Sequence, residues 1–311
     1  MNQHFSMEPV AEAVPTPVAP FELPAPAPLT HKTLPAGSRL FDLGQLEVSW
    51  DGSTGALWTW MTPNDRPNFN RGMLRDFELW QDEIHREFAG ADAGLKYLVL
   101  GSRFPRVWNL GGDLDLFSSF IMRGDRAGLV RYGRDCVAML YNHMRPDSPA
   151  VTIALVQGDA LGGGFEAMLS FNVVVAEKGA RFGMPEIAFG LFPGMGAHCL
   201  LARKLGLAQA EKMILSGRTY SAEEMADLGL VHVLAEPGCG EEAVRTYIQK
   251  NGRKQNGHRG IYRASALVDP VSLEELEAVV DVWADAALSL TVTDLKLMRR
   301  LVDAQSRLRD L

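Results

Sequence analysis

The chain has 311 residues, of which 47% are hydrophobic and 22% charged, a composition that supports a large buried core and excludes disorder of the whole chain. Its formal net charge is -7, so it lacks the basic excess that neutralises phosphates, and we expect no nucleic-acid partner. No apolar run is long enough to span a membrane, and the start of the chain lacks a signal-peptide pattern. We therefore expect a cytoplasmic protein that makes no membrane contact.

The three cysteines, Cys136, Cys199 and Cys239, lie far apart and show neither CxxC spacing nor histidines at metal-ligand spacing. This pattern indicates reduced thiols rather than a disulfide framework or a zinc site. We expect neither a metal ion nor an organic cofactor.

Proline recurs throughout residues 1–36, at a density that neither a helix nor a sheet tolerates. We expect this segment to be a disordered tail. Proline-rich chains also bind partner proteins, so a docking role for the tail stays open.

The folded part begins near residue 46, where strand-like and helical patterns start to alternate. In chain order we expect strands at 46–50 and 56–61, a helix at 71–88, a strand at 96–101, a helix at 126–144, a strand at 149–156, a helix at 163–170, a strand at 172–176, a short helix after the capping box of Ser221 and Glu224, a strand at 230–234 and helices from 272. This alternation predicts an α/β fold with a parallel sheet buried on both faces.

The run QGDALGGGFE, residues 157–166, leads from an expected strand through a glycine-rich loop into an expected helix. Glycines there leave amide N–H groups free at a helix N-terminus, which suits an anion or a developing oxyanion. Residues 162–167 also match the loose GxGxxA form of a dinucleotide-binding turn. Against that alternative, the glycines do not follow the strand directly, and the acidic residue after the next strand comes too early.

Two glutamates stand in apolar surroundings, Glu166 at the start of the expected helix and Glu186 in a glycine- and proline-rich stretch. Burying a carboxylate is costly unless it is protonated, hydrogen-bonded or used. Two carboxyls that face one cavity separate their protonation steps, so that one serves as acid and the other as base. Either glutamate alone is more simply a surface or helix-end charge, and only the pair indicates catalysis.

A second glycine loop, FPRVWNLGGDLD at residues 104–115, follows the strand at 96–101. In a parallel sheet the loops at the carboxyl ends of strands converge, so we expect this loop to face Gly162. Each loop then offers one backbone N–H. Asp113 is also expected to cap the helix that begins at Leu114.

Taken in this order and spacing, these segments resemble the crotonase superfamily, also called the enoyl-CoA hydratase/isomerase family. The similarity runs from Leu46 to Leu234. It rests on RPNFN (66–70), NLGGD (109–113), QGDALGGGFE (157–166), and MPE with GLFPG between 184 and 194.

The resemblance implies a ββα spiral domain at 37–235 and a C-terminal helical region at 236–311 that covers an acyl pocket and supports trimerisation. It implies that the N–H groups of Gly112 and Gly163 form an oxyanion hole. Glu166 and Glu186 would then be the two catalytic carboxyls of a hydratase. A homotrimer or a dimer of trimers is expected on the same grounds.

Within the superfamily, the chain is most similar to the synthases of diffusible signal factors, which are cis-2-unsaturated fatty acids used in quorum sensing. The similarity lies in LWTWMTPNDRPNFN, RVWNLGGDLDLF, QGDALGGGFEA and the segment QKNGRKQNGHRGIYRAS at 249–265. It implies dehydration of a 3-hydroxyacyl carrier-protein thioester, followed by hydrolysis to the free acid. The cis geometry rests on this resemblance alone.

The segment 249–265 departs from ordinary hydratases and puts their usual CoA-binding pattern in doubt. Its basic residues would either meet an acidic acyl carrier protein or form a solvated loop; they are Arg253, Lys254, Arg259 and Arg263. The choice between a carrier-protein and a CoA thioester stays open.

An acyl tail needs an apolar pocket, and we expect residues beside the motif loops or on the C-terminal helices to form it: Leu161, Gly162, Met195, Trp283 and Leu301. For Trp283 and Leu301, ordinary core packing is the alternative. Two other functions stay open, an ordinary enoyl-CoA hydratase and a regulatory protein that docks a sensor.

Overall fold

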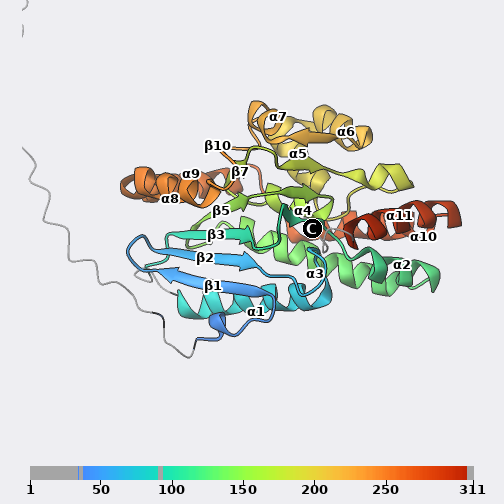
Figure 1. Cartoon of the computed structure of the whole chain (residues 1–311), viewed down its shortest axis with the longest axis horizontal. Coiled ribbons are helices and arrows are strands. Elements are labelled where there is room, and N and C mark those ends of the chain that lie inside the picture. Colours follow the sequence, from blue (N-terminus) through green and yellow to red (C-terminus); the bar gives the residue numbers. More distant parts are fainter. Residues whose placement is uncertain (1–33, 35–37, 90–93, 307–311) are drawn as a thin grey trace, which may run out of the picture. The chain divides into compact units, whose positions relative to one another are not determined.

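The computed structural model describes residues 34, 38–89 and 94–306. The expected tail at 1–36 lies outside these residues apart from Leu34, which is buried. The largest sheet consists of β1 (Leu46–Asp51), β2 (Ala56–Met61), β3 (Tyr97–Ser102), β5 (Val151–Val156), β7 (Val173–Glu177) and β10 (Val233–Ala235), in that spatial order (Figure 1). Strand β1 is antiparallel to β2, and every other neighbouring pair is parallel.

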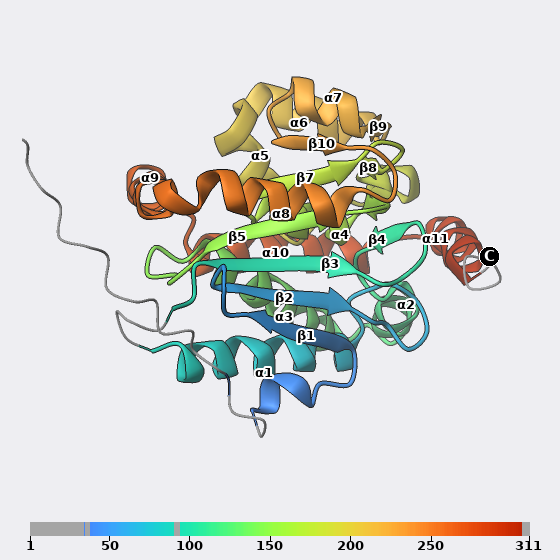
Figure 2. The ribbon, with the colours of Figure 1, turned by 60° about the vertical axis from the view of Figure 1, so that its left-hand side comes forward.

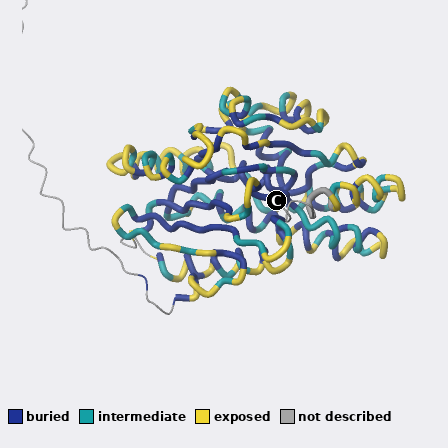
Figure 3. The backbone as a smooth tube through the Cα atoms, in the orientation of Figure 1, coloured by how far each residue is buried: buried dark blue, intermediate teal, exposed yellow. Residues whose placement is uncertain are grey.

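The four central strands, β2, β3, β5 and β7, are buried at every position, as their apolar sequences predict, whereas the edge strands β1 and β10 are partly exposed. In β3, for example, Leu98 and Leu100 join one apolar cluster, whereas Tyr97 and Val99 join another on the opposite face. Helix α8 (Gly240–Asn251) covers the second face, and α1 (Arg71–Glu87) and α3 (Arg126–Met144) lie on the other side (Figure 2). In Figure 3, which has the orientation of Figure 1, the central strands β2, β3 and β5 are buried along their whole length.

A smaller sheet contains β4 (Val107–Asn109), β6 (Asp159–Leu161), β8 (Arg181–Gly183) and β9 (Thr219–Ser221) in that order. The first three are parallel, and β9 is antiparallel to β8. The chain alternates between the sheets, passing from β3 to β4, from β5 to β6 and from β7 to β8. Helices follow each of these pairs, so the fold is the expected α/β spiral of ββα turns.

The remaining helices are α2 (Leu114–Met122), α4 (Gly163–Leu169), α5 (Ala197–Leu205), α6 (Leu207–Ser216), α7 (Ala222–Asp227), α9 (Gln255–Val268), α10 (Leu273–Leu288) and α11 (Val292–Ser306). Three short 3₁₀ helices occur at Arg39–Phe41, Pro185–Phe189 and Gly252–Lys254. The predicted caps are present: the Asp113 side chain accepts from two amides at the start of α2, and Ser221 and Glu224 form a capping box. Within the described residues, no helix is both long and apolar enough to span a bilayer.

The structure corrects three details of the sequence prediction. The segment 249–265, one reading of which was a solvated loop, instead forms the end of α8, a 3₁₀ turn and most of α9. The segments at 104–115 and 157–161 are not simple loops, because each contains a strand of the smaller sheet. The strand expected at 230–234 begins only at Val233.

Candidate active site

The two glycine loops lie against each other at the carboxyl ends of β3 and β5. A Cβ atom on Gly164 would lie 2.0 Å from the Asn109 carbonyl oxygen, and one on Gly111 would lie 2.4 Å from the Gly163 nitrogen. Side chains at these positions would force the loops apart, so glycine is required for this approach. Gly111 also has a positive φ of 86°, which other residues rarely adopt.

This approach leaves two backbone donors at one cavity. Gly112 and Gly163 both line it, and neither N–H donates a hydrogen bond to any acceptor in the described part of the chain. Gly163 is the first residue of α4, where the helix dipole favours negative charge. By contrast, the Gly111 N–H is occupied, because it donates to Asn109 Oδ1 at 2.7 Å. The pair can therefore stabilise an oxygen that becomes negative.

Glu166 projects from the first turn of α4, with only 1% of its surface exposed. Its Oε1 accepts hydrogen bonds from the amides of Met195 and Ala197, at 2.8 and 2.9 Å. Burial raises the pKa of Glu166 above its usual range, the negative charge of Glu186 adds to the shift, and the two amides oppose it. The carboxyl is thus held in one orientation with its second oxygen left for chemistry.

Glu186 lies in the 3₁₀ helix Pro185–Phe189 and faces the same cavity. Its Oε1 lies against Gly162, where a Cβ would be only 2.7 Å away, and its buried Oε2 has no hydrogen-bond partner in the described structure. Burial also raises the pKa of Glu186. Because two buried carboxyls that face one cavity lose their protons one after the other, there is a pH range in which one is protonated while the other is ionised.

The raised pKa values predict how stability depends on pH. A carboxyl whose pKa is higher in the folded than in the unfolded state binds more protons when folded, so its contribution to stability falls as pH rises. Starting from the ordinary value of 4.5, we expect wild-type stability to fall between about pH 5 and about pH 8 relative to the double variant Glu166→Gln/Glu186→Gln. Thermal melting of both proteins across this range measures the difference, and parallel curves would contradict the expectation.

The cavity between the glutamates and the glycine loops has a volume of about 60 Å³. Its wall contains Gly112, Leu114, Phe117, Tyr132, Gly133, Cys136, Gly163, Glu166, Glu186, Phe189, Leu191, Gly194, Met195 and Trp283. The rings of Phe117 and Trp283 stack at 4.9 Å and close one side. Of the expected acyl-pocket residues, Met195 and Trp283 line this cavity, whereas Leu161 and Gly162 lie beside it and Leu301 packs against the core.

Several lining residues did not emerge from the sequence. Tyr132, Gly133 and Cys136 lie on α3, where helical spacing places them on one face but does not reveal what that face meets. Phe117 lies on α2 as the last residue of the RVWNLGGDLDLF motif, but nothing in the sequence places its ring beside the glutamates. Their proximity to the glutamates exists only in the folded chain.

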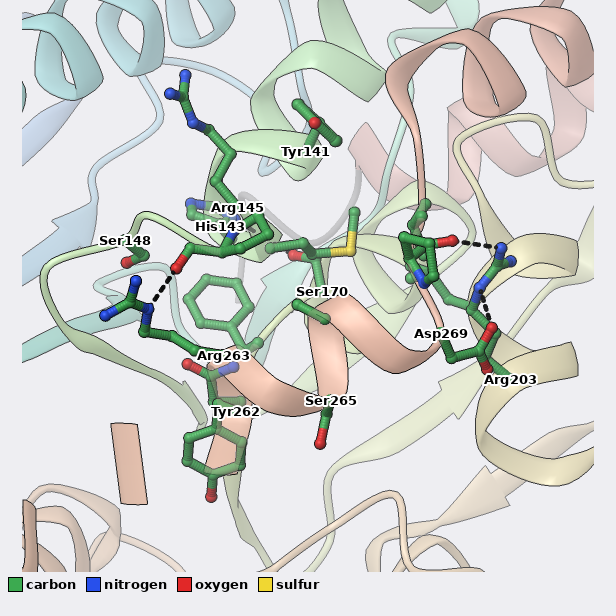
Figure 4. Close-up of a pocket in the computed structure, with 18 of the residues that line it drawn as sticks. Tyr141, His143, Arg145, Ser148, Ser170, Arg203, Tyr262, Arg263, Ser265 and Asp269 are labelled. Carbon is green, nitrogen blue, oxygen red and sulfur yellow. Dashed lines mark hydrogen bonds and ion pairs between the residues drawn. The ribbon is translucent and has the colours of Figure 1, made fainter. Parts of the chain in front are cut away.

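A larger cavity of about 500 Å³ lies at the opposite end of α4, where Ser170 caps the helix. Figure 4 shows Arg145 and Arg203 on opposite sides of it, with His143 and Ser170 between them. Burial lowers the pKa of His143 to about 4, so the ring is neutral at physiological pH. The only carboxyl among its described lining residues, Asp269, pairs with Arg203. Among the described lining residues, no second carboxyl accompanies Asp269 in this cavity.

The basic segment at 249–265 lies far from the cavity that Glu166 and Glu186 line. Arg259 and Arg263 donate to the carbonyls of Pro149 and Pro146, just before β5 begins, whereas the glycine loop follows the end of that strand. A strand of six residues separates these points by about 20 Å. A carrier protein bound at this segment would therefore contact the end of the sheet opposite the glutamates.

Comparison with known proteins identifies the family. The family model described as enoyl-CoA hydratase/isomerase matches residues 87–262. The chain belongs to this family. A putative enoyl-CoA hydratase/isomerase of Bacillus subtilis, YhaR, is 31% identical over 72% of this chain and 80% of its own length. A probable enoyl-CoA hydratase of the same organism is 31% identical over 47% of this chain and 54% of its own length.

Solved structures share the fold of this chain. Pseudomonas aeruginosa DspI is 25% identical with a TM-score of 0.64, covering 76% of this chain and 86% of that one. An enoyl-CoA hydratase from Bacillus halodurans is 20% identical with a TM-score of 0.66, covering 83% and 100%. The spiral core is therefore that of the family.

Proposed function

We propose that this family member dehydrates a 3-hydroxyacyl thioester and then hydrolyses it, releasing a cis-2-unsaturated fatty acid that serves as a quorum-sensing signal. The thioester partner would be acyl carrier protein or CoA. The observation that carries the proposal is the pairing of Glu166 and Glu186 across one cavity from two backbone N–H groups that have no acceptor among the described residues. The resemblance of the motif loops to the signal-factor synthases supports the choice of product.

In the dehydration step, the thioester carbonyl accepts hydrogen bonds from Gly112 and Gly163, which stabilise the enolate formed when the C2 proton leaves. The ionised carboxyl takes that proton, and the protonated carboxyl gives its proton to the departing C3 hydroxyl, which leaves as water. The pair ends with one proton, as it began. That proton now lies on the other carboxyl, so it must return to the first one, directly or through water, before the next turnover.

Hydrolysis can use the same groups. An ionised carboxyl removes a proton from water as the water oxygen attacks the thioester carbon, and the two amides stabilise the tetrahedral oxyanion. When the carbon–sulfur bond breaks, that proton passes to the departing thiolate. The products are a free acid and the thiol of the carrier.

Incubation of the purified protein with 3-hydroxydodecanoyl carrier protein and 3-hydroxydodecanoyl-CoA, followed by mass spectrometry and double-bond analysis, tests the proposal. We expect free cis-2-dodecenoic acid. Rapid hydration of crotonyl-CoA without release of free acid would instead identify an ordinary hydratase. Absence of turnover with every thioester would favour a regulatory binding role.

The cavity is too small to hold a long acyl chain, so we expect side chains of its wall to move when such a chain binds. Pockets that enclose drug-sized ligands occupy about 300–1,000 Å³, far more than the 60 Å³ found here. Trp283 stacks on Phe117 and packs over Gly194, so Trp283→Ala should open this side. We expect kcat/KM to shift towards longer chains, measured with a series of acyl thioesters.

Trp50→Ala is a matched control, because Trp50 is also half-buried beside a phenylalanine but lies outside the cavity wall. Its chain-length profile should match that of the wild type. An unchanged profile in Trp283→Ala would mean that Trp283 only packs the core.

A further inference from the structure

The Tyr132 hydroxyl joins the two backbone segments that flank the Gly112 donor. Tyr132 lies on α3 with 6% of its surface exposed, and its ring lines the catalytic cavity. Its oxygen accepts a hydrogen bond from the Asp113 amide at 2.7 Å and donates one to the Phe69 carbonyl at 2.8 Å. The Tyr132 hydroxyl thus connects Asp113, which follows Gly112, to Phe69, which forms a parallel β-bridge with Gly112.

Phe69 fixes the orientation of the peptide group between Gly111 and Gly112, which contains the Gly112 N–H donor. Its amide donates to the Gly111 carbonyl oxygen at 2.7 Å. Because a trans peptide is planar, the Gly111 C=O and the Gly112 N–H point in opposite directions. The bond from Phe69 therefore turns the Gly112 N–H away from Phe69 and leaves it free at the cavity.

We infer that Tyr132 is a positioning residue whose hydroxyl, through Phe69 and Asp113, sets the direction of the Gly112 N–H donor. Because its hydroxyl is already bonded to the Asp113 amide and the Phe69 carbonyl, we assign it no proton transfer of its own. Burial raises the pKa of Tyr132 well above its usual range, so the phenol keeps its proton and remains a donor. The inference rests on the proposed thioester chemistry at this cavity.

Tyr132→Phe removes one oxygen and keeps the ring. Loss of a whole oxyanion donor lowers kcat by about 10²–10³-fold, and for a misdirected donor we expect a fall of at least about tenfold with KM changed by less than about threefold. The control is Tyr97→Phe, since Tyr97 is equally buried but its hydroxyl has no partner in the described structure and it lies outside the cavity. We expect its kcat to equal that of the wild type.

A spectroscopic measurement tests the role of Tyr132 independently of whether the proposed reaction takes place. The probe is dodecanoyl-CoA with a methylene in place of sulfur and ¹³C at the carbonyl, which cannot be hydrolysed. On binding to the wild type, its carbonyl stretch should move to lower frequency, and Tyr132→Phe should reduce that displacement without a matching loss of affinity. This readout applies even if no thioester is turned over.

Either a wild-type kcat or an undiminished carbonyl displacement in Tyr132→Phe would overturn the inference. If the phenylalanine variant does not fold, 3-fluorotyrosine at position 132 keeps the hydroxyl but makes its oxygen a poorer acceptor. This variant should reduce the displacement of the probe's carbonyl stretch, though by less than loss of the hydroxyl would. A displacement equal to that of the wild type would again overturn the inference.

Discussion

Replacing Glu166 with glutamine should lower the rate of thioester dehydration by about 10²–10⁴-fold, the usual range for loss of a general acid or base. Glutamine keeps an oxygen that can accept from the Met195 and Ala197 amides, so the side chain stays in place. It cannot, however, take or give the shared proton. Glu186→Gln should have a similar effect, because each carboxyl depends on the other for the second proton transfer.

Glu177→Gln is a close control. Glu177 is also buried, and its two oxygens accept from the amides of Gly238 and Gly240, at 2.8 and 2.9 Å. It lies outside the catalytic cavity. Mass spectrometry of the products from all three variants measures the rates, and undiminished free unsaturated acid from Glu166→Gln or Glu186→Gln would refute the two-carboxyl mechanism.

Gly111→Ala should lower kcat by about 10²–10³-fold, the cost of losing one oxyanion donor. The added methyl group would lie 2.4 Å from the Gly163 nitrogen, so it would either cover that donor or push the loops apart. The new residue would also have to adopt a positive φ, which costs about 1–2 kcal/mol. Both effects act at the point where the carbonyl is expected to bind.

Gly179→Ala is a control that separates the cost of a positive φ from the effect of blocking the Gly163 donor. Gly179 has a φ of 96°, and a Cβ there would meet no atom within 4 Å. We expect this variant to lose stability by about 1 kcal/mol and to keep its kcat. If Gly111→Ala behaves in the same way when melting temperature and kcat are measured together, the loop contact does not contribute to catalysis.

Most of the large sheet and the long helices could be predicted from sequence, because each carries a repeated local pattern. Six-residue apolar runs such as Val151–Val156, and helical stretches such as Arg71–Glu87, are long enough to show it. The capping roles of Asp113 and Ser221 could also be predicted from sequence, because a cap depends on neighbours within the same turn.

The smaller sheet was not predicted, for a physical reason. Its strands, such as Val107–Asn109 and Asp159–Leu161, have three residues each, which is too short for an alternating pattern. They are extended because they pair with one another across long sequence separations. Sequence patterns likewise identified Glu166 and Glu186, but the ring stack of Phe117 on Trp283 depends on tertiary packing between α2 and α10.

Because the glycine loops are in close contact, one part of the cavity wall does not tolerate larger side chains, whereas another part does. Backbone atoms of Gly111 and Gly163 form the first part, and no side chain can be added there without separating them. Phe117 and Trp283 form the second part, on helices that do not carry the donors. On the proposed function, we therefore expect changes at these two aromatic positions to alter acyl preference while the carbonyl-binding backbone stays the same, and directed evolution of chain length should start from them.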